Sequence, residues 1–482
     1  MPAAGTTRLL KEFPEALNGG TGAVFVGAGV SMSAGYPSWS ALLREIGEEL
    51  GVGSSDVTDL AALAQWSIQE SGSSTRVRNV IKEQIGRSLP VPPALEILAR
   101  LPVRHVWTTN YDRLIERAFE AIGRPIDSIS GAKDLALRAT PGATRLYKMH
   151  GSVDRLDDVV ISTDDYELYR SRRGSYLPLL QAHLTSMSML FIGLSFTDPN
   201  VRHVLSLIRE SFTDAPPEHF AIVRPPHESD FQTPSEFRTR AAQHSLWARD
   251  LRRYGLVPVE IDSYAEVPAL LRRVERSVAS KRVWVSGSWP ITGAATEIAR
   301  IHDVAVGIGQ LIGETGRTLV TGTGLIVGSA TVAGFLDSLR NSGAWDLERR
   351  LIARPFPVPT PGQTANLEQW TVLRQELARL SGVVIFVGGT KEGPNGTVIA
   401  DGVLQEAEVA QAAGCFLLPI GATGGAANVL ATRLIESPLS SEGSGAVRAT
   451  DEELRALSDS DTSIPTLLEI VGRVLNRLSA SN

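Results

Sequence analysis

The sequence predicts an α/β protein that contains two doubly wound parallel sheets. Short apolar runs of the length of buried strands recur along the chain, separated by longer stretches with helical spacing. Several of these runs end in a glycine-rich loop, as strands do at the ligand-binding edge of a parallel sheet. The chain has 482 residues, more than one hydrophobic core usually serves, so we expect at least two domains.

Six apolar runs are the expected strands of the first half. In chain order they are AVFVGAG (23–29), HVWTTN (105–110), LYKMHG (146–151), SMLFIGLSF (188–196), FAIV (220–223) and LVPVEI (256–261). A mostly helical stretch lies between residues 51 and 100. Its two amphipathic segments predict an insertion that covers the ligand crevice of the sheet.

A second series of strands and loops begins after a helical segment at 265–281, and we place the domain boundary near residue 280. The expected strands are RVWVSGSWP (282–290), TLVTGTGLIVG (318–328), GVVIFVGGT (382–390) and GCFLLPIGATGG (414–425). The loop sequences of the two halves differ, so they do not indicate an internal repeat. They predict two unlike nucleotide-type domains, residues 1–280 and residues 281–482.

Composition and charge narrow the class of protein. Apolar residues make up 43% and charged residues 21%, as in an ordinary folded protein, and the formal net charge of −6 argues against a general nucleic-acid binder. No apolar run reaches the length of a spanning helix, so we expect a cytoplasmic protein without a membrane anchor. Cys415 is the single cysteine, which excludes an internal disulfide and a metal site built from several cysteines.

The loop after the first expected strand is a candidate cradle for a diphosphate. Gly27, Ala28 and Gly29 place little side chain in the way of a ligand, and glycine can adopt a positive φ. Ser31 can add a hydroxyl donor. A single glycine-rich loop is also typical of a tight turn, so this signal alone does not decide between a turn and a ligand site.

Polar residues follow two further strands at the edge of the sheet where we expect the ligand. Thr109, Asn110 and Asp112 lie between a buried strand and a helix, where the alternative role of Asn110 or Asp112 is to cap that helix. His150 follows the third apolar run, immediately before a glycine. A histidine taken by itself is more often structural than catalytic.

The fourth run ends in a short loop that contains Gly193 and Ser195. Taken in order, the segments GAGVS, TTNYD, KMHG and GLS resemble the sirtuin family over about residues 20–265. The resemblance implies a Rossmann-like fold that binds NAD and uses a histidine as catalytic base. It assigns catalysis to Asn110, Asp112 and His150, and NAD binding to Gly27, Ala28, Gly29, Ser31, Thr109, Gly193 and Ser195.

Two departures from the sirtuin pattern bear on the reaction. Deacylating sirtuins carry a four-cysteine zinc site, which this chain cannot build, so we expect no metal. Their first motif continues as GIPDFR, whereas this chain has GYPSWS and lacks the arginine. With no acyl-lysine, water is the simplest acceptor, and the expected products from NAD are nicotinamide and ADP-ribose. A zinc-free deacylase and a nucleotide-binding scaffold without activity stay open as alternatives.

The candidate residues suit the cleavage of NAD. Breaking the bond between nicotinamide and ribose builds positive charge on the sugar, as in glycoside cleavage. Asn110 and Asp112 can place an amide dipole and a carboxylate near that charge. His150 can accept a proton from a ribose hydroxyl or from the attacking water.

The second half resembles the SLOG group of Rossmann-like nucleotide sensors over residues 282–482. The segments that carry this resemblance are VSGSWP, TGTGLIVGSATVAGF, FVGGTKEGPNGT and GVLQEAEVAQAAG. Glycine loops after strands also occur in folds that bind nothing there. Five residues are expected to hold a nucleotide signal, with the basic side chains on phosphates and the carboxylate on a ribose: Gly287, Ser288, Arg374, Lys391 and Glu406.

A sirtuin-like domain followed by a SLOG domain resembles the effector family of the bacterial Thoeris anti-phage defence system. The resemblance implies that a cyclic ADP-ribose isomer, made by a partner protein with a TIR domain, binds the SLOG domain and switches on NAD hydrolysis. It also implies a homo-oligomer, commonly a tetramer. The residues themselves indicate two nucleotide sites and do not show which one is regulatory.

Overall fold

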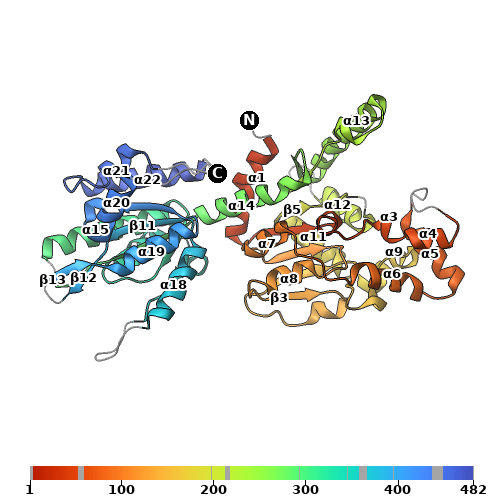
Figure 1. Cartoon of the computed structure of the whole chain (residues 1–482), viewed down its shortest axis with the longest axis horizontal. Coiled ribbons are helices and arrows are strands. Elements are labelled where there is room, and N and C mark those ends of the chain that lie inside the picture. The colour runs from red at the N-terminus through yellow and green to blue at the C-terminus, as the bar shows by residue number, and fades with distance from the viewer. Residues whose placement is uncertain are drawn as a thin grey trace. The chain divides into compact units, whose positions relative to one another are not determined.

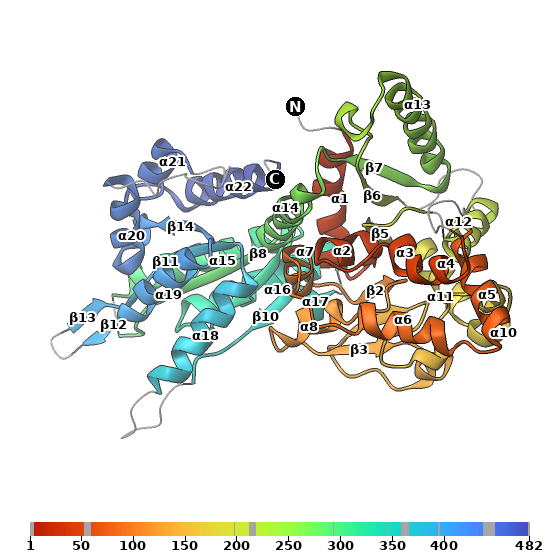
Figure 2. The ribbon, with the colours of Figure 1, turned by 45° about the vertical axis from the view of Figure 1, so that its right-hand side comes forward.

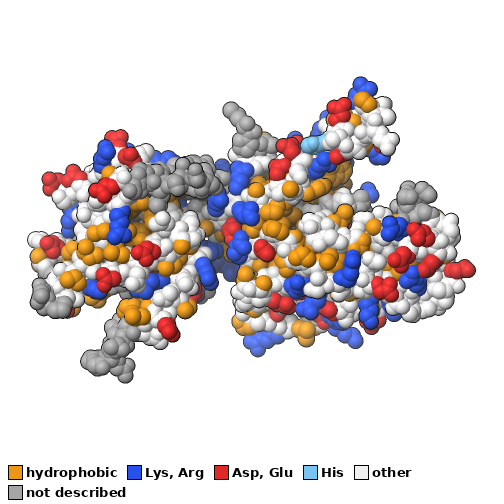
Figure 3. Space-filling view, viewed as in Figure 1, with side chains coloured by type: hydrophobic (Ala, Val, Ile, Leu, Met, Phe, Trp, Pro, Cys, Tyr) orange, Lys and Arg blue, Asp and Glu red, His pale blue; other side chains and the backbone are white. Residues whose placement is uncertain are grey.

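The computed structural model describes residues 4–52, 59–196, 198–211, 218–292, 294–344, 346–357, 366–393, 396–436 and 449–480. The chain divides into two compact units, Met1–Glu275 and Arg276–Asn482, which we describe separately (Figure 1). Both are α/β units built on a parallel sheet, which confirms the predicted fold class. On the face that Figure 3 shows, basic and acidic side chains are interspersed over each unit.

The first unit contains a seven-stranded sheet in the order β3-β4-β2-β1-β5-β6-β7, and all of its strand pairs are parallel. Figure 2 shows β3 and β7 at the two edges of this sheet. The strands are β1 (Gly22–Val26), β2 (His105–Thr108), β3 (Ile126–Ile129), β4 (Thr144–Lys148), β5 (Ser188–Ile192), β6 (His219–Val223) and β7 (Leu256–Glu260).

Helices connect these strands and cover a core that includes Phe25, Trp107 and Phe191, each almost fully buried. Two of them, α1 and α11, bury one side against the sheet. The helices are α1 (Ala4–Gly19), α2 (Ala28–Ser33), α3 (Trp39–Leu42), α4 (Arg44–Glu49), α5 (Leu60–Ser71), α6 (Thr75–Ile85), α7 (Pro93–Arg100), α8 (Leu114–Glu120), α9 (Thr163–Glu167), α10 (Tyr169–Arg173), α11 (Tyr176–Ser186), α12 (Pro199–Ser211) and α13 (Pro234–Leu251). Helix α14 (Val267–Ser280) begins in the first unit and ends past its last residue, Glu275.

The predicted helical insertion between β1 and β2 is confirmed by α5, α6 and α7, while its residues 53–58 lie outside the described chain. Helix α5 contacts the segment that follows β4. The Gln65 side chain donates to Asp164 Oδ2 over 3.0 Å and accepts from the Asp164 amide over 3.1 Å. Arg78 of α6 donates to the carbonyl of Asp157 over 3.2 Å. The insertion therefore packs on residues that come shortly after His150 in the chain.

The second unit contains a five-stranded parallel sheet in the order β10-β9-β8-β11-β14 and a separate antiparallel hairpin, β12–β13. Its strands are β8 (Arg282–Ser288), β9 (Thr318–Thr321), β10 (Leu351–Ala353), β11 (Val383–Gly388), β12 (Thr390–Gly393), β13 (Gly396–Ile399) and β14 (Phe416–Ile420). Its helices are α15 (Ala295–Glu314), α16 (Val327–Ser342), α17 (Leu347–Arg350), α18 (Leu367–Leu380), α19 (Asp401–Ala412), α20 (Gly425–Glu436), α21 (Asp451–Ala456) and α22 (Ile464–Ala480).

All ten strands that the sequence predicts are present, and the structure adds β3, β10 and the hairpin β12–β13. Those additions lie at sheet edges or outside the main sheets, where their side chains are largely exposed or half-buried. Such strands lack the continuous apolar run of a central parallel strand, so the pattern does not reveal them. No helix in the described parts of the chain is long and apolar enough to cross a membrane.

Candidate active site

The four loops singled out in the first half follow four adjacent strands of one sheet, in the order β4-β2-β1-β5. Because these strands are parallel, their carboxyl ends meet at the same edge. After β1 the chain proceeds to β2, β3 and β4 on one side, and then crosses to β5 on the other side of β1. The ligand crevice of an open α/β sheet lies at such a reversal of strand order.

The glycine loops after β1 and β5 contact each other at this reversal. The Gly27 amide donates to the carbonyl of Ile192 over 2.8 Å, and the Gly29 amide donates to the carbonyl of Gly193 over 2.9 Å. A Cβ atom on Gly27 would lie 2.4 Å from the Gly193 oxygen, and one on Gly29 would lie 3.0 Å from the Gly193 Cα. Glycine is therefore required here for the close approach of two backbones.

The first loop does not use the positive φ that glycine can adopt. Gly27 has a φ of −100°, and Gly29 lies within helix α2, whereas Gly193 in the opposite loop has a φ of +66°. The first loop enters a helix directly from extended backbone, so it needs no left-handed residue. Ala28 and Gly29 are exposed at the start of α2, where a ligand can approach the backbone.

Ser31, Asn110 and Asp112 form one buried hydrogen-bonded cluster beside the glycine loop. The Ser31 hydroxyl donates to Asp112 Oδ2 over 2.6 Å and accepts from Asn110 Nδ2 over 2.8 Å. Asn110 Nδ2 also lies 3.1 Å from the carbonyl oxygen of Gly27. The structure thus brings together three predicted site residues from the loops after β1 and β2.

Asn110 retains one polar atom that a ligand can satisfy. Its Oδ1 atom is buried and has no hydrogen-bond partner among the described residues. Because an unpaired buried acceptor is costly, this atom fits a site completed by a donor such as a ribose hydroxyl. Asp112 Oδ1, in contrast, accepts from the Leu114 amide over 2.9 Å at the start of α8. The helix-capping alternative therefore holds for Asp112, while the Asn110 side chain points to Gly27 and Ser31.

His150 lies just after β4 in a second buried cluster. Its Nε2 atom is 3.1 Å from Asp198 Oδ2, at the distance of an ion pair but without the alignment of a hydrogen bond. The Tyr166 ring packs nearly at right angles to the imidazole with centroids 5.5 Å apart, and its hydroxyl donates to the same Asp198 oxygen over 3.3 Å. A carboxylate beside a histidine can orient the ring of a catalytic base.

Asp198 is a candidate functional residue that the sequence analysis did not single out. Its Oδ1 atom accepts from the amides of Asn200 and Val201 over 3.0 and 3.1 Å, so the residue begins α12. Burial raises the pKa of Asp198, but His150 and the two amides lower it more, and the resulting pKa lies below the usual range. The Asp-Pro pair predicts only a helix start, because nothing in the sequence places residue 198 beside residue 150.

The candidate catalytic side chains are nearly closed off from solvent. His150 is 5% exposed, Asp112 6%, Ser31 7% and Asn110 8%. Thr109 is half-buried, and Ser195 is exposed on the loop after β5. A dinucleotide can meet the outer loop residues in this conformation, whereas access to the inner atoms requires a local rearrangement.

In the second unit, the end of β8 and the loop after β11 meet where the strand order of the five-stranded sheet reverses. The Gly389 amide donates to the Ser288 carbonyl over 2.9 Å, and the Ser288 hydroxyl donates to the Thr390 carbonyl over 3.0 Å. A Cβ atom on Gly287 would lie 2.0 Å from the carbonyl oxygen of Val387. Gly287 and Ser288 therefore lie at the predicted ligand edge, in tight contact with the neighbouring loop.

Arg374 and Glu406 form a buried pair in this unit. Glu406 Oε2 accepts from the Ser286 hydroxyl over 2.5 Å, and its Oε1 lies 4.0 Å from Arg374 Nε. Burial raises the pKa of Glu406 to about 7, although Ser286 and Arg374 both favour its charged form. The guanidinium of Arg374 lies over the rings of Phe356 and Trp370, 5.6 and 5.8 Å from their centroids. Contacts with Ser286, Phe356 and Trp370 therefore fix the positions of Glu406 and Arg374 without a bound ligand.

Lys391 lies in a separate, exposed pair on the hairpin. Its Nζ donates to Asp401 Oδ2 over 2.8 Å, and the two side chains are 50% and 74% exposed. The predicted signal-binding residues thus occupy three places: the end of β8, the buried pair of Arg374 and Glu406, and the exposed hairpin.

The two units, each with loops gathered at a strand-order reversal, define a SIR2-like unit followed by a SLOG unit. Residues 104–246 match the SIR2-like domain family, and residues 266–478 match the Sir2- and TIR-associating SLOG family. The SIR2-like match begins just before β2 and so includes the loop of Asn110, His150 and the Gly193 loop.

Curated proteins are similar to this chain over part or most of its length. The chain is 34% identical over 423 residues to the NAD(+) hydrolase ThsA of Bacillus cereus (strain MSX-D12), in a match that covers 86% of each chain. It is 32% identical over 441 residues to the NAD(+) hydrolase ThsA of Enterococcus faecium, which covers 89% of this chain and 90% of that relative. Defense-associated sirtuin 2 of Bacillus subtilis is 29% identical over 233 residues, which cover 46% of this chain and 23% of that relative. The chain belongs to the ThsA family of NAD(+) hydrolases.

Proposed function

We propose that this chain is an anti-phage defence effector that hydrolyses NAD to nicotinamide and ADP-ribose when a nucleotide signal binds its second domain. The observation that carries the first part is the cluster of Ser31, Asn110 and Asp112 at the strand-order reversal, with the buried Asn110 Oδ1 left for a donor. Membership of the ThsA family of NAD(+) hydrolases supports NAD as the substrate. No metal ion is needed for this reaction as we propose it.

In the proposed reaction, the loops of residues 27–29 and 193–195, in which Ala28, Gly29 and Ser195 are exposed, hold the dinucleotide at its diphosphate and riboses together with Thr109. Asn110 accepts a hydrogen bond from a hydroxyl of the nicotinamide ribose. The bond between that ribose and nicotinamide breaks, and the positive charge that builds on the sugar is stabilised by the Asp112 carboxylate and the Asn110 dipole. His150 accepts a proton from the attacking water, which forms the new bond to the sugar.

We propose that residues 1–280 carry this reaction and that residues 281–482 regulate it. The proposed signal is a cyclic ADP-ribose isomer made by a partner protein with a TIR domain, a link supported by the name of the matching SLOG family. Arg374 and Lys391 would bind its phosphates, Glu406 a ribose, and the Gly287–Ser288 backbone the region between them. We propose that the effector acts as a homo-oligomer, a tetramer, in the bacterial cytoplasm.

The burial of the catalytic side chains supports a resting state that the signal must relieve. A ligand can change the population of the active state only through its preference for that state. Moving a population from about 1% to about 99% active requires roughly 5.5 kcal/mol of differential binding. Several linked signal sites in an oligomer can contribute to this total.

Product analysis tests the proposal against its two alternatives. The full chain is incubated with NAD, with and without cyclic ADP-ribose isomers, and the products are separated by chromatography. Nicotinamide together with ADP-ribose supports hydrolysis. An O-acyl-ADP-ribose formed only with an acylated peptide would identify a zinc-free deacylase, and NAD that stays intact in every ligand state would identify a nucleotide-binding scaffold.

A further inference from the structure

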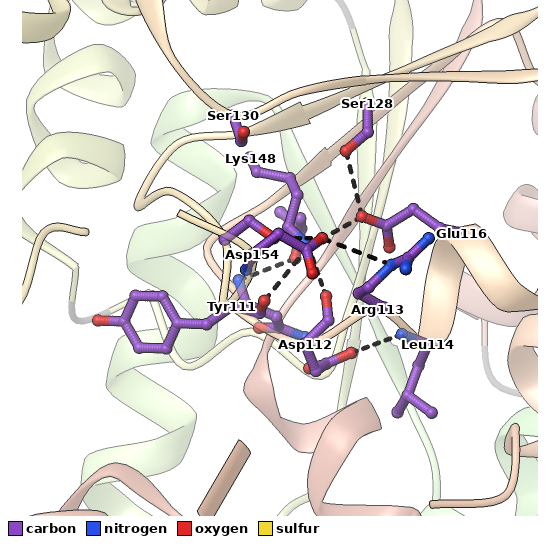
Figure 4. A network of polar contacts seen from close by, with 12 residues as sticks. Tyr111, Asp112, Arg113, Leu114, Glu116, Ser128, Ser130, Lys148 and Asp154 are labelled. Atoms are coloured by element: carbon purple, nitrogen blue, oxygen red, sulfur yellow. Dashed lines mark hydrogen bonds and ion pairs between the residues drawn. The ribbon is translucent and has the colours of Figure 1, made fainter. Parts of the chain in front are cut away.

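Lys148 is a buried lysine that contacts the loop carrying Asn110 and Asp112. It is the last residue of β4, two positions before His150, and its side chain is fully buried. Its Nζ donates to the main-chain carbonyls of Tyr111 and Asp112, as Figure 4 shows. One ammonium group thus holds two consecutive peptide carbonyls of the loop that the proposed reaction uses.

Glu116 supplies the opposite charge. Its Oε1 lies 3.0 Å from Lys148 Nζ and accepts a second hydrogen bond, over 3.1 Å, from the Ser128 hydroxyl of β3 (Figure 4). The Glu116 side chain is 5% exposed, and its Oε2 has no hydrogen-bond partner among the described residues. A buried ion pair of this kind contributes little net stability, because desolvation offsets most of the attraction between the charges. Stabilisation of the fold therefore does not explain why this pair is present, and we look for its role in the position of the loop.

The contacts around Lys148 connect both catalytic segments. The Asn110–Asp112 loop is also hydrogen-bonded to the segment after His150, because the Val153 amide donates to the Tyr111 carbonyl over 2.9 Å. The Tyr111 hydroxyl in turn donates to the carbonyl of Val160 over 2.7 Å. Lys148 thus lies at the centre of the contacts that set the position of this loop relative to His150.

We propose that Lys148 is a positioning residue, whose ammonium fixes the Asn110–Asp112 loop relative to His150 while Glu116 neutralises its charge. This inference rests on the proposed function, because the loop matters only if Asn110 and Asp112 act on NAD. In such a site a misplacement of about 1 Å can cost roughly a hundredfold in rate. Lys148 affects the rate through the loop and makes no contact with the substrate.

Four variants of the full chain separate positioning from simple stability. Lys148→Met removes the donor and leaves Glu116 unpaired, so we expect lower stability and a loss of kcat of about 100-fold. Lys148→Met/Glu116→Gln removes both charges and keeps the Ser128 contact, so we expect stability to return toward wild type while kcat stays low. Glu116→Gln keeps the lysine donor and should stay within about threefold of wild-type kcat. Arg124→Met is the matched control: it removes a cation that binds the carbonyls of Ala99, Leu101 and Val103, near the amino end of β2.

The measurements are NAD turnover with the activator, thermal unfolding, and hydrogen exchange of the amides of residues 109–114. The inference predicts faster exchange of these amides in the double variant and wild-type kcat in Arg124→Met. Wild-type turnover by a folded double variant, or unchanged exchange, would overturn it. If neither Lys148 variant folds, Glu116→Gln decides, since a large loss of kcat in that folded variant contradicts the assigned role. If wild-type protein does not cleave NAD, the proposed function fails, while the exchange experiment still tests whether Lys148 holds the loop.

Discussion

His150 Nε2 lies 3.1 Å from Asp198 Oδ2, and this contact joins the segment after β4 to the segment after β5. Both side chains are largely buried, and Tyr166 contacts each of them. The carboxylate favours one orientation of the imidazole, in which Nε2 faces Asp198. The proposed base is thus held by a residue that follows β5, the strand on the other side of β1.

Asp198→Asn tests this orienting role. The amide oxygen of asparagine can still cap α12, so we expect the fold to remain intact, while loss of the charge lowers kcat for NAD cleavage by about 10- to 100-fold. The KM for NAD should change much less, because Asp198 is not among the proposed NAD contacts. Steady-state kinetics with the activator measures both values. If a folded Asp198→Asn variant kept the wild-type kcat, Asp198 would serve only to begin helix α12 and not to orient His150.

His150→Ala and Asn110→Ala test the proposed catalytic pair. Each should lower NAD cleavage by about a hundredfold or more, because each removes an interaction made in the transition state. Circular dichroism and thermal unfolding check that the variants fold. Asn110→Ala also loses the hydrogen bonds to Gly27 and Ser31, so we expect a loss of about 1 to 3 kcal/mol in unfolding free energy. Near-normal turnover in either folded variant is incompatible with the assigned roles.

Substitutions in the first glycine loop should separate packing from binding. Gly27→Ala places a Cβ 2.4 Å from the Gly193 oxygen and should lower the unfolding free energy by about 1 to 3 kcal/mol. Ala28→Asp lies on an exposed residue at the start of α2, so stability should change by less than about 0.5 kcal/mol. Its carboxylate repels the diphosphate, and we expect the KM for NAD to rise about tenfold or more. Unchanged KM in Ala28→Asp would remove this loop from the proposed NAD site. Gly29→Val should combine both effects, since it obstructs the diphosphate and crowds Gly193.

The exposed pair of Lys391 and Asp401 offers a matched test of signal binding. Lys391→Ala should make NAD turnover unresponsive to the activator while thermal stability stays near wild type, because the pair is exposed. Asp401→Asn breaks the same pair but leaves the lysine free for a phosphate, so its response should be retained or strengthened. Turnover is measured against activator concentration. Equal losses of response in both variants would indicate that the ion pair, and not the lysine, matters.

Arg374→Ala should also abolish the response, but it leaves Glu406 buried without its partner. We therefore expect a measurable loss of stability in this variant, unlike in Lys391→Ala. Arg374→Ala/Glu406→Gln removes the charge of both residues and should recover part of the stability while remaining unresponsive. Recovery of the response in that double variant would show that Arg374 serves only to neutralise Glu406.

The stability of the first unit should fall as the pH falls from 7 to 5. Burial lowers the pKa of His183 and that of His219 from 6.5 to about 4. The unfolded chain therefore binds more protons between these values, so the stability from each neutral histidine is present above pH 6.5 and is lost progressively toward pH 4. We expect a decrease of roughly 2 kcal/mol per histidine from pH 7 to 5. Urea unfolding at both pH values checks this, and His219→Gln is expected to weaken the dependence. Equal stability at both pH values would contradict the prediction.

The local pattern of apolar residues was sufficient to predict the central strands and the loops that follow them. The β1 loop, the Asn110 loop and the Gly193 loop all follow continuous apolar runs, and parallel pairing brings them to one edge. The role of glycine at residue 27 was less predictable, because it depends on the distance to Gly193 in another loop. The hydrogen-bond and ion-pair partners of a side chain are also less predictable, because they too lie in other segments of the chain.

Local sequence patterns could not predict contacts between residues that are distant in the sequence. Asp198 and His150, or Glu116 and Lys148, come from different elements, and only the packed sheet brings them together. Charged residues in a sequence are most often exposed, so nothing in the pattern indicates that Lys148 is fully buried. The strand-order reversal between β1 and β5 likewise follows from topology and not from any single segment.

The most direct test of the central claim is the rate of NAD turnover by the purified full chain, measured with and without cyclic ADP-ribose isomers. We predict that NAD stays intact without a signal and that one isomer switches on its conversion to equal amounts of nicotinamide and ADP-ribose. Full turnover without any isomer would contradict the regulatory role of the second domain. Intact NAD with every isomer would contradict the proposed activity.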